Sequence, residues 1–379
     1  MSILHINSYY STSHFYKHLY EYQKKYGYDI DVFVPVASTY TNSCFDFGDY
    51  TTISRCYKQF DRMIFHLKHY KILRDVQSKY KVTNYSLLHA HSLFSNGYIA
   101  LNLKKRYGVS YIVAVRNTDV NVFFKKMVHL RRLGVEILEG ASHIVFLSEA
   151  YRKHVIDNYV PCKHKNRIRE KSSIIPNGID DFWLNNAGSP RQKPYTEMQL
   201  LQIGDIDKNK NIITTINAIE LLLEKGYQIK LNVVGKIKDQ KIFDKIKELD
   251  YVNYLGYISK EELIKIYRKN DIFILPSIHE TFGLVYAEAM SQGLPVIYSK
   301  GQGFDGQFED GTVGYAVNSL DHNDIAEKII KIFYDYEIKS KNCIELFHKF
   351  DWKTIACDYL SLYENLGNKG GSFRKLLVQ

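Results

Sequence analysis

Two glutamates with seven residues between them, Glu280 and Glu288, are the carboxylates whose surroundings point most clearly to chemistry. The apolar run at 271–275 predicts a buried strand of a parallel sheet. Residues 287–292 and the Gly293 that follows predict a helix and its end. Glu280 would then lie at the carboxyl end of a strand, where open α/β sheets bind ligands, and Glu288 inside the next helix.

The residues around this pair resemble a known signature. The chain has Pro276-Ser-Ile-His-Glu, then Thr-Phe-Gly-Leu-Val-Tyr-Ala-Glu-Ala-Met, with Gly293 and Pro295 close behind. This resembles the motif of the retaining glycosyltransferases with the GT-B fold, in glycosyltransferase family 4 of the group 1 type. Ser291 stands where that family usually has alanine. The resemblance implies an α/β chain with two Rossmann-like, doubly wound domains that face each other across a cleft.

The resemblance also assigns roles to the signature. Glu280, with a catalytic role, would contact hydroxyls of the donor sugar, and Glu288 would bind the ribose. The amides of Phe282, Gly283 and Leu284 would face the donor phosphates, because a helix N-terminus can bind a diphosphate without a metal. The alternative is structural: Glu280 would cap the helix, and Glu288 would be an exposed helix carboxylate.

A second loop carries the expected cation. The segment 203–212, Ile-Gly-Asp-Ile-Asp-Lys-Asn-Lys-Asn-Ile, resembles the family's strand-to-helix loop with a late lysine. The resemblance makes Lys210 the catalytic cation for the diphosphate and places Gly204 in the donor site. Asp205 stands where the family has arginine. Either Lys208 replaces that charge, or Asp205 only caps the loop.

Two further segments belong to the expected donor side. In Gly256-Tyr-Ile-Ser, the backbone of Ile258 could pair with the base edge and Tyr257 could flank the base. A core contact is an equally good interpretation of this pair. Three glycines within 301–306 resemble the family's glycine loop, where Asp305 could touch donor or acceptor.

The N-terminal half supplies the expected acceptor side. The strand end at 84–92 resembles a family segment and would project His91 into the cleft. His89 and His91 have a spacing that could suggest a metal site, but no third ligand is evident, so we predict none. Arg116 stands where the family has histidine. It cannot act as a base, but it could stabilise charge on the leaving phosphate or bind an acidic acceptor.

Other expected residues on this side lie near two loops. Asn117 and Asp119 share the segment of Arg116, and Asp119 could contact acceptor hydroxyls or cap the next helix. The loop 10–15 departs most from the family, which usually has two glycines there. Ser13 is the candidate N-cap of a helix over 13–25 and could still serve the donor.

Composition predicts a two-domain cytoplasmic protein. The chain has 379 residues, of which 45% are hydrophobic, and its apolar runs are only of strand length. The N-terminus reads as a strand and not as a signal peptide. Five cysteines stand singly, which favours reduced thiols over disulfides or zinc.

The positive charge is concentrated in one half of the chain. Residues 1–180 carry 26 Lys+Arg against 14 Asp+Glu, whereas residues 181–379 carry 25 against 27. Apolar Ile64, Leu67, Tyr70 and Leu73, interleaved with Arg62, Lys68, Lys71 and Arg74, predict a basic amphipathic helix. The surface could be a solvated face, or it could contact an anionic membrane peripherally. Nucleic acid is not expected, because no recognised motif is present.

Alternating strand and helix patterns divide the chain into predicted parts. These are an acceptor-side Rossmann-like domain at 1–183, a linker rich in breakers at 184–196, and a nucleotide-sugar-binding domain at 197–350. A final helix in 351–379 would pack back toward the first domain.

The resemblance implies a retaining, metal-independent, hexosyl-type glycosyltransferase. Its co-substrate would be a nucleoside diphosphate sugar, with UDP-sugar favoured over GDP-sugar, and no cofactor is expected. The acceptor would be a glycan or a lipid-linked hydroxyl in bacterial surface polysaccharide or glycolipid assembly. Two alternatives remain open: a GT-B nucleotide-sugar epimerase, and a non-catalytic subunit that partners another transferase.

Overall fold

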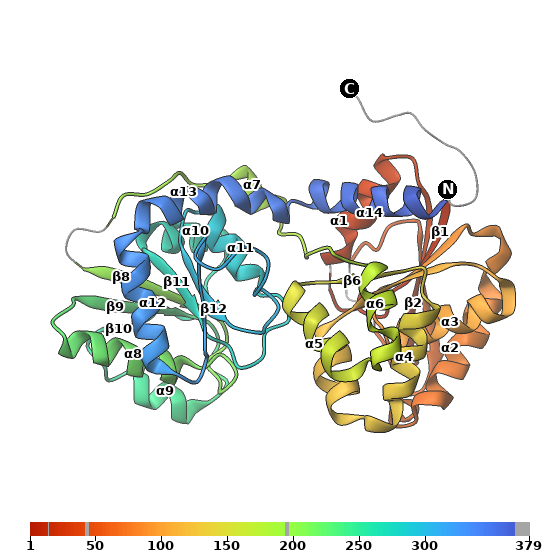
Figure 1. The fold of residues 1–379 in the computed structure, drawn as a ribbon, viewed down its shortest axis with the longest axis horizontal. Coiled ribbons are helices and arrows are strands. Elements are labelled where there is room, and N and C mark those ends of the chain that lie inside the picture. The colour runs from red at the N-terminus through yellow and green to blue at the C-terminus, as the bar shows by residue number, and fades with distance from the viewer. Residues whose placement is uncertain (14, 42–44, 194–196, 368–379) are drawn as a thin grey trace. The chain divides into compact units, whose positions relative to one another are not determined.

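The chain forms two compact units in a computed structural model that describes residues 1–13, 15–41, 45–193 and 197–367 (Figure 1). Unit 1 contains Met1–Leu147, Arg152–Ile175 and the C-terminal segment from Trp352. Unit 2 contains Ser148–Tyr151 and Pro176–Asp351. The end of the predicted linker at 194–196, the tail at 368–379, and His14 and Cys44 lie outside the described residues.

Unit 1 is built around a sheet whose neighbouring strands all pair in parallel within the described residues. The strand order is β3-β2-β1-β4-β5-β6-β7. Strands β4 and β5 are buried along their whole length, as the apolar sequence of β5 predicts, and β4 buries His89 among apolar residues. The strands are β1 (Ser2–Ile6), β2 (Asp29–Ala37), β3 (Thr51–Tyr57), β4 (Leu87–Ala90), β5 (Tyr111–Val115), β6 (His143–Phe146) and β7 (Ser172–Ile174).

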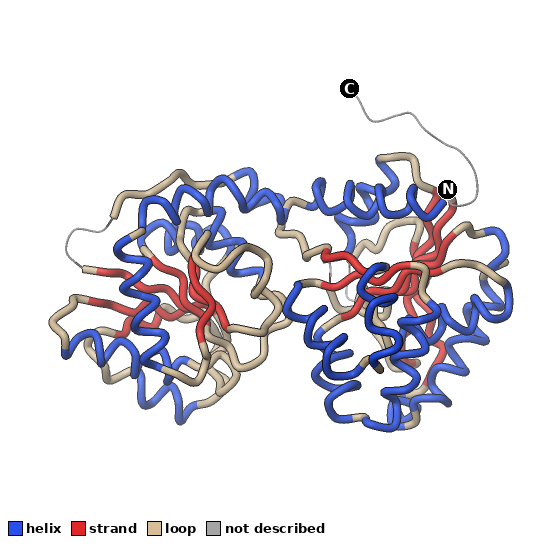
Figure 2. Tube along the Cα trace, in the orientation of Figure 1, coloured by secondary structure: helices blue, strands red, loops and turns tan. Residues whose placement is uncertain are grey.

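Helices on both sides cover this sheet (Figure 2). They are α1 (Phe15–Lys25), α2 (Phe65–Lys79), α3 (Ser95–Tyr107), α4 (Arg131–Gly140), α5 (Glu149–Tyr159), α6 (Cys162–Glu170) and α14 (Trp352–Gly367). Short turns η1 (Gln59–Met63), η2 (Val82–Asn84), η3 (Asp119–Phe124) and η4 (Val128–Leu130) lie between them. The predicted basic amphipathic helix is interrupted, because Ile64 is extended, with φ −114° and ψ 98°, and separates η1 from α2.

The last helix, α14, is part of unit 1. Its first residue, Trp352, meets Phe15 of α1 with ring centroids 4.7 Å apart. Tyr363 is fully buried. Its hydroxyl accepts a hydrogen bond from Gln23 Nε2 at 3.0 Å and lies 2.7 Å from His89 Nδ1. Helix α14 thus contributes to the core of unit 1, which otherwise consists of residues from the first half of the chain.

Unit 2 has a second parallel sheet, in the order β10-β9-β8-β11-β12-β13. Its strands are β8 (Met198–Ile203), β9 (Ile229–Val234), β10 (Val252–Tyr254), β11 (Ile272–Leu275), β12 (Val296–Ser299) and β13 (Gly314–Val317). Its helices are α7 (Asp181–Asn185), α8 (Ile212–Glu224), α9 (Gln240–Ile246), α10 (Lys260–Lys269), α11 (Leu284–Ser291), α12 (His322–Tyr334) and α13 (Tyr336–Leu346), followed by η5 (Phe347–Phe350).

Each sheet has one point at which the strand order changes direction. In unit 1 this point lies between β1 and β4, and in unit 2 between β8 and β11. Loops diverge from the carboxyl ends of such strand pairs and leave a crevice there. The candidate site residues should therefore be found at these two places. Among the described residues, none of the helices is long and apolar enough to cross a membrane.

We predict that Tyr363→Phe destabilises the protein, although it removes a single oxygen. The phenol satisfies two buried polar groups, so its loss should lower the free energy of unfolding by ~1–3 kcal/mol. Tyr334→Phe is the matched control, because that side chain is largely exposed. Chemical denaturation of both variants checks this, and equal stability of the two would contradict it.

Candidate active site

Three loops meet at the carboxyl edge of the unit 2 sheet. They follow β8 (204–211), β11 (276–283) and β12 (300–306), three strands that are neighbours in the sheet. The first two loops flank the point where the strand order changes direction. This is the edge at which the sequence predicted Lys210 and Glu280.

Lys210 and Glu280 form an ion pair across this point. Lys210 Nζ lies 2.7 Å from Glu280 Oε2, and Ser277 Oγ donates to the same oxygen at 3.2 Å. The backbone N–H of Thr281 donates to Glu280 Oε1 at 3.1 Å. The side chains of Lys210 and Glu280 are 23% and 12% exposed, so the pair is held in the fold yet open on one side. A basic and an acidic group are thereby presented together at a ligand-binding edge.

Asparagines fix the loop that carries Lys210. Asn209 exchanges two hydrogen bonds with the backbone of His279, each of 3.0 Å, and its carbonyl accepts from Ile278 N at 2.8 Å. Asn211 adopts a left-handed conformation with φ 56° at the start of α8. Its amide donates to Pro276 O at 3.1 Å. The position of Lys210 beside Glu280 is thus determined by backbone contacts and not by the ion pair alone.

The glycine loop after β12 packs directly on the loop of Glu280. Glu280 N donates to Gln302 Oε1 at 2.9 Å, and Gly303 N donates to Glu280 O at 3.2 Å. A Cβ on Gly303 would lie 1.9 Å from Thr281 O, so only glycine permits this approach. Asp305 accepts from Gly301 N at 2.7 Å and therefore shapes this loop.

Helix α11 begins beside the ion pair. Gly283 precedes it with φ 74°, and a Cβ there would lie 2.3 Å from the Tyr286 ring. Phe282 is buried against Phe350, with ring centroids 5.5 Å apart, and this contact anchors the turn. The N–H groups at the start of a helix have no intrahelical partner and carry a partial positive charge. The region of Phe282, Gly283 and Leu284 can therefore bind an anion next to Lys210.

Glu288 lies in α11 and is half-buried, not exposed as the structural alternative expected. Tyr267 OH donates to its Oε2 at 3.2 Å, and the Trp183 side chain also bonds to it. Burial is the main cause that raises the pKa of Glu288 to about 7, although the bonds from Tyr267 and Trp183 oppose the shift. The carboxylate is thus oriented by two aromatic donors.

The expected base-binding segment follows β10 and meets the end of β9, where Gly235 N donates to Gly256 O at 2.9 Å. A Cβ on Gly235 would lie 1.9 Å from Gly204 O, so the backbone chains approach closely there. Ile258 is half-buried, whereas Tyr257 is 74% exposed with Lys236 Nζ 4.8 Å from its ring centroid. Tyr257 is therefore not a core residue, and most of its side chain is exposed. Lys208, the candidate substitute for a missing cation, is exposed.

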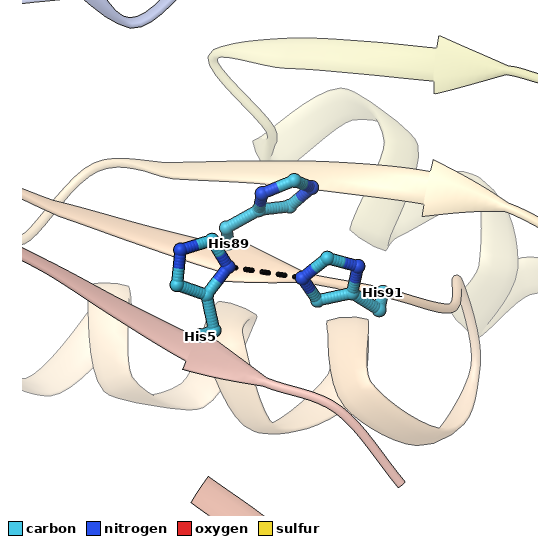
Figure 3. A group of neighbouring side chains, drawn as sticks. All are labelled: His5, His89 and His91. Carbon is cyan, nitrogen blue, oxygen red and sulfur yellow. Dashed lines mark hydrogen bonds between the residues drawn. The ribbon is translucent and has the colours of Figure 1, made fainter. Parts of the chain in front are cut away.

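The corresponding point of unit 1 is occupied by three histidines (Figure 3). His5 lies on β1, and His89 and His91 lie at the end of β4; all three are fully buried. His5 Nδ1 is 3.0 Å from His91 Nε2, and the rings of His89 and His91 stack with centroids 4.1 Å apart. His91 was expected to project into a cleft, but it is packed inside unit 1 because β1 and α1 cover it with rings, including Tyr16 and Tyr20.

His5 also corrects the argument about a metal. The sequence showed no third ligand, yet candidate ligand atoms of the three histidines lie within 4.8 Å of one another. Burial lowers the pKa of His5 to about 3, and burial followed by neighbouring positive groups, including Arg116, holds the pKa values of His89 and His91 far below their usual range. The argument from a missing third ligand therefore fails. That no metal binds stays a prediction.

Arg116 and Asp119 join two loops at the carboxyl edge of unit 1. The Asp119 carboxylate accepts from the backbone N–H of Leu93, Phe94 and Arg116 at 2.9–3.0 Å. Arg116 is 7% exposed, and its Nε donates to His91 O at 3.3 Å. Asp119 therefore acts here as a loop anchor and not as the predicted cap of the next helix, which begins at Asp119 itself. Asn117 is half-buried and accepts a hydrogen bond from Asn121.

In the loop at residues 10–15, where the family usually has two glycines, side-chain hydroxyls bond to nearby backbone carbonyls. Ser11 Oγ donates to Ser8 O at 3.0 Å, and Thr12 Oγ1 donates to Tyr9 O at 3.1 Å. Phe15 N, the first residue of α1, donates to Ser13 Oγ at 3.4 Å. Ser13 thus contacts the helix start, as expected of a cap.

Two family models match the chain on either side of this architecture. "Glycosyltransferase Family 4" matches residues 13–181, and "Glycosyl transferases group 1" matches residues 189–346. Together they cover most of the sequence. The chain belongs to the group 1 glycosyltransferases, family 4.

Relatives of this group 1 glycosyltransferase come from distant organisms. An uncharacterized glycosyltransferase of Methanocaldococcus jannaschii is 23% identical over 80% of this chain and 84% of its own length. The phosphatidyl-myo-inositol mannosyltransferase of Mycobacterium leprae is 24% identical over 52% of this chain and 54% of its own. The capsular polysaccharide biosynthesis glycosyltransferase CapM of Staphylococcus aureus is 27% identical over the same shares.

Solved structures confirm the predicted GT-B fold. Sucrose-phosphate synthase from Thermosynechococcus elongatus has a TM-score of 0.74 at 20% identity, covering 98% of this chain and all of its own. Anabaena HepE in complex with UDP-glucose has a TM-score of 0.64 at 16% identity, covering 96% and 100%.

Several residues of this glycosyltransferase's site could not be found from the sequence. Asn209 and Gln302 are common polar residues in loops, and only the adjacency of the strand ends brings them to Glu280. Tyr267 and Trp183 reach Glu288 from α10 and α7, both outside the signature. His5 could have been noticed in the sequence, because it lies inside the strand predicted at the N-terminus, where a histidine is unusual.

We predict that Glu288→Gln removes a pH dependence of stability. The folded pKa of about 7 lies above the ordinary value of 4.5, so the wild type loses stability from this group as the pH rises from 4.5 to 7. The whole pKa shift corresponds to ~3 kcal/mol in the free energy of unfolding. Because Glu288 is only partly buried, we expect a change of ~1–2 kcal/mol.

The comparison requires thermal or chemical unfolding at pH 5 and pH 8. Glu261→Gln, on exposed α10 surface, is the control and should track the wild type. An unchanged pH profile in Glu288→Gln would contradict the assignment.

Proposed function

We propose that this group 1 glycosyltransferase transfers a hexosyl group from a nucleoside diphosphate sugar to a hydroxyl acceptor, with retention and without a metal. The Lys210–Glu280 pair beside the start of α11 carries the proposal, because it combines a cation, helix N–H groups and a sugar-binding carboxylate. The cation and the helix N–H groups can bind a diphosphate, and the carboxylate can accept hydrogen bonds from sugar hydroxyls.

Donor binding would rearrange the ion pair. The diphosphate would take Lys210 Nζ and the N–H groups of Phe282, Gly283 and Leu284. Glu280, released from Lys210 but still held by Ser277 and Thr281, would accept hydroxyls of the sugar. Glu288 would bind the ribose, with its ionised form favoured above its pKa of about 7. Tyr257, next to Ile258, would cover the base with its exposed side chain.

We favour UDP-sugar over GDP-sugar as the donor, since HepE was solved with UDP-glucose. In the proposed reaction the bond between the sugar's anomeric carbon and the β-phosphate oxygen breaks on one face. The acceptor oxygen bonds to the same face, and its proton passes to the leaving diphosphate. Lys210 would neutralise the charge that develops there, which is the form of catalysis expected to contribute most.

The acceptor side is proposed from unit 1. Arg116, Asn117, Asp119, His91 and Ser13 lie at or behind the carboxyl edge of its sheet. Arg116 would assist the leaving group or bind an acidic acceptor. The relatives CapM and the phosphatidyl-myo-inositol mannosyltransferase support a glycan or lipid-linked acceptor. We infer a cytoplasmic enzyme of bacterial surface polysaccharide or glycolipid assembly.

Two alternatives make different predictions. An epimerase would convert its nucleotide sugar without an acceptor, which product analysis detects. A non-catalytic partner subunit would keep its biological function after Glu280→Ala or Lys210→Ala. The rewritten loop at Ser11 and the aspartate at 205 are compatible with that reading. The preserved geometry of Lys210 and Glu280 favours an enzyme.

We expect UDP-sugars to raise the unfolding temperature more than GDP- or ADP-sugars. A donor at about 100 times its Kd should stabilise the folded protein by ~2.7 kcal/mol. Thermal shift without added metal, and with a chelator present, measures this. Stabilisation by none of the three classes would refute the donor site, and dependence on metal would refute metal independence.

We predict that Lys210→Ala lowers kcat/KM for sugar transfer by about 10²- to 10³-fold, the loss typical of one electrostatic contact to a developing charge. Lys225→Ala is the matched control, because it removes an exposed lysine just past the other end of α8. Initial rates with the best donor check this. Equal activity of both variants would remove Lys210 from the mechanism.

A further inference from the structure

Unit 1 exposes several large apolar side chains along one segment of the chain. Phe60 and Met63 of η1, Ile64, and Leu67 and Tyr70 of α2 are between 40% and 84% exposed. We name these five residues the apolar stripe. Leu67 and Tyr70 are three residues apart and lie on one side of α2, and Phe60, Met63 and Ile64 come just before this helix. Isolated exposed apolar residues are ordinary, but a continuous row marks an interaction surface.

The opposite side of α2 already serves the fold. His69, Ile72 and Val76 are buried, and α2 packs on α3 and β3 (Figure 1). The stripe is therefore not a displaced core face, because α2 has a separate core face. The segment therefore carries apolar residues of two kinds, one set buried in unit 1 and the other exposed.

A buried aspartate holds the stripe in place. Asp61 accepts from Lys71 Nζ at 2.7–2.8 Å and from Lys58 N at 2.6 Å. These bonds tie η1 to α2 across the extended residue Ile64. Phe60 and Met63, on either side of Asp61, are consequently directed to solvent. The hydrogen bonds of Asp61 thus account for the exposure of Phe60 and Met63.

The charge around the stripe has one sign. Residues 51–132 contain 16 basic and three acidic residues. All three acids are engaged: Asp61 as described, Asp75 with Ser54 and with Lys79 at 3.5 Å, and Asp119 with three backbone N–H groups. Arg62, Arg74, Lys125 and Lys126 are exposed. Of the residues named in the predicted amphipathic helix, Lys71 is paired with Asp61 and Lys68 lies over the Tyr57 ring.

A second segment with exposed apolar and basic residues adjoins the start of α2. Phe123 of η3 meets Phe65 at the start of α2, with ring centroids 6.0 Å apart. Val122 beside it and Val128 of η4 are both exposed. Lys125 and Lys126 lie between these two valines in the sequence. Apolar and basic residues therefore alternate over two adjoining segments.

We propose that the apolar stripe and the surrounding lysines and arginines dock unit 1 on an anionic lipid surface. The apolar side chains would enter the boundary between headgroups and acyl chains, and the basic groups would meet the lipid phosphates. Uniform positive charge excludes a basic partner, and the apolar row gives a reason for lipid over nucleic acid. The site goes beyond sugar transfer and does not depend on the identity of the donor.

Co-sedimentation with vesicles tests the proposal. The full chain should bind vesicles of phosphatidylcholine and phosphatidylglycerol, and bind phosphatidylcholine alone at least tenfold more weakly. The double variant Phe60→Ser/Met63→Ser should lose at least tenfold in affinity. Lys125→Gln/Lys126→Gln should lose about fivefold per charge and should flatten the dependence on salt.

Leu320→Ser/Ile338→Ser is the matched control, because it removes two comparably exposed apolar residues from unit 2. It should bind vesicles as the wild type does. Wild-type binding that is absent, or unchanged in Phe60→Ser/Met63→Ser, would overturn the proposal. So would charge-dependent binding to RNA in place of vesicles, or a self-association that this variant abolishes.

The donor thermal shift separates this proposal from the proposed enzyme activity. The stripe variants should retain the full shift with the best nucleotide sugar, since they alter only exposed side chains of unit 1. Loss of vesicle binding with an intact shift supports lipid docking specifically. An intact vesicle interaction with no donor shift would refute the donor site and leave the docking surface standing.

Discussion

The contact between Lys210 and Glu280 depends on one constraint, the parallel order of the strands in unit 2. Parallel strands deliver their carboxyl ends to the same edge, and the change of order between β8 and β11 opens a space at that edge. Residues 70 positions apart in sequence therefore meet at 2.7 Å. The glycine loop after β12 then closes on the same segment, because Gly303 admits a backbone contact that any side chain would block.

The same topology has a different outcome in unit 1. Its change of strand order lies between β1 and β4, but three buried imidazoles and the rings of Tyr16 and Tyr20 fill the region behind it. Asp119 binds backbone groups and is not free for a ligand. Unit 2 thus presents an open pair of charges, whereas unit 1 presents a packed polar core with Arg116 near its surface. We expect the acceptor specificity of this enzyme to arise from the carboxyl edge of the unit 1 sheet, where its sequence departs from the family.

Most of the fold could be predicted from the sequence, because strand patterns and helix patterns alternate along the chain as a parallel α/β sheet requires. Strand β11 lies where the apolar run at 271–275 placed it, and helix α1 lies within the predicted range 13–25. The polar edge strand β3 and the short β10 carried no such pattern and were not predicted. Within the site, Lys210 and Glu280 were predictable from motifs, but their hydrogen-bond partners Asn209 and Gln302 were not. Those contacts depend on strand adjacency, as does the meeting of His5 with His91.

A crystal structure of the full chain with UDP would test the central claim most directly. The account predicts the diphosphate beside Lys210 Nζ and the N–H groups at the start of α11, the ribose hydroxyls on Glu288, and Glu280 no longer paired with Lys210. A diphosphate bound elsewhere, with the Lys210–Glu280 pair intact, would contradict the account.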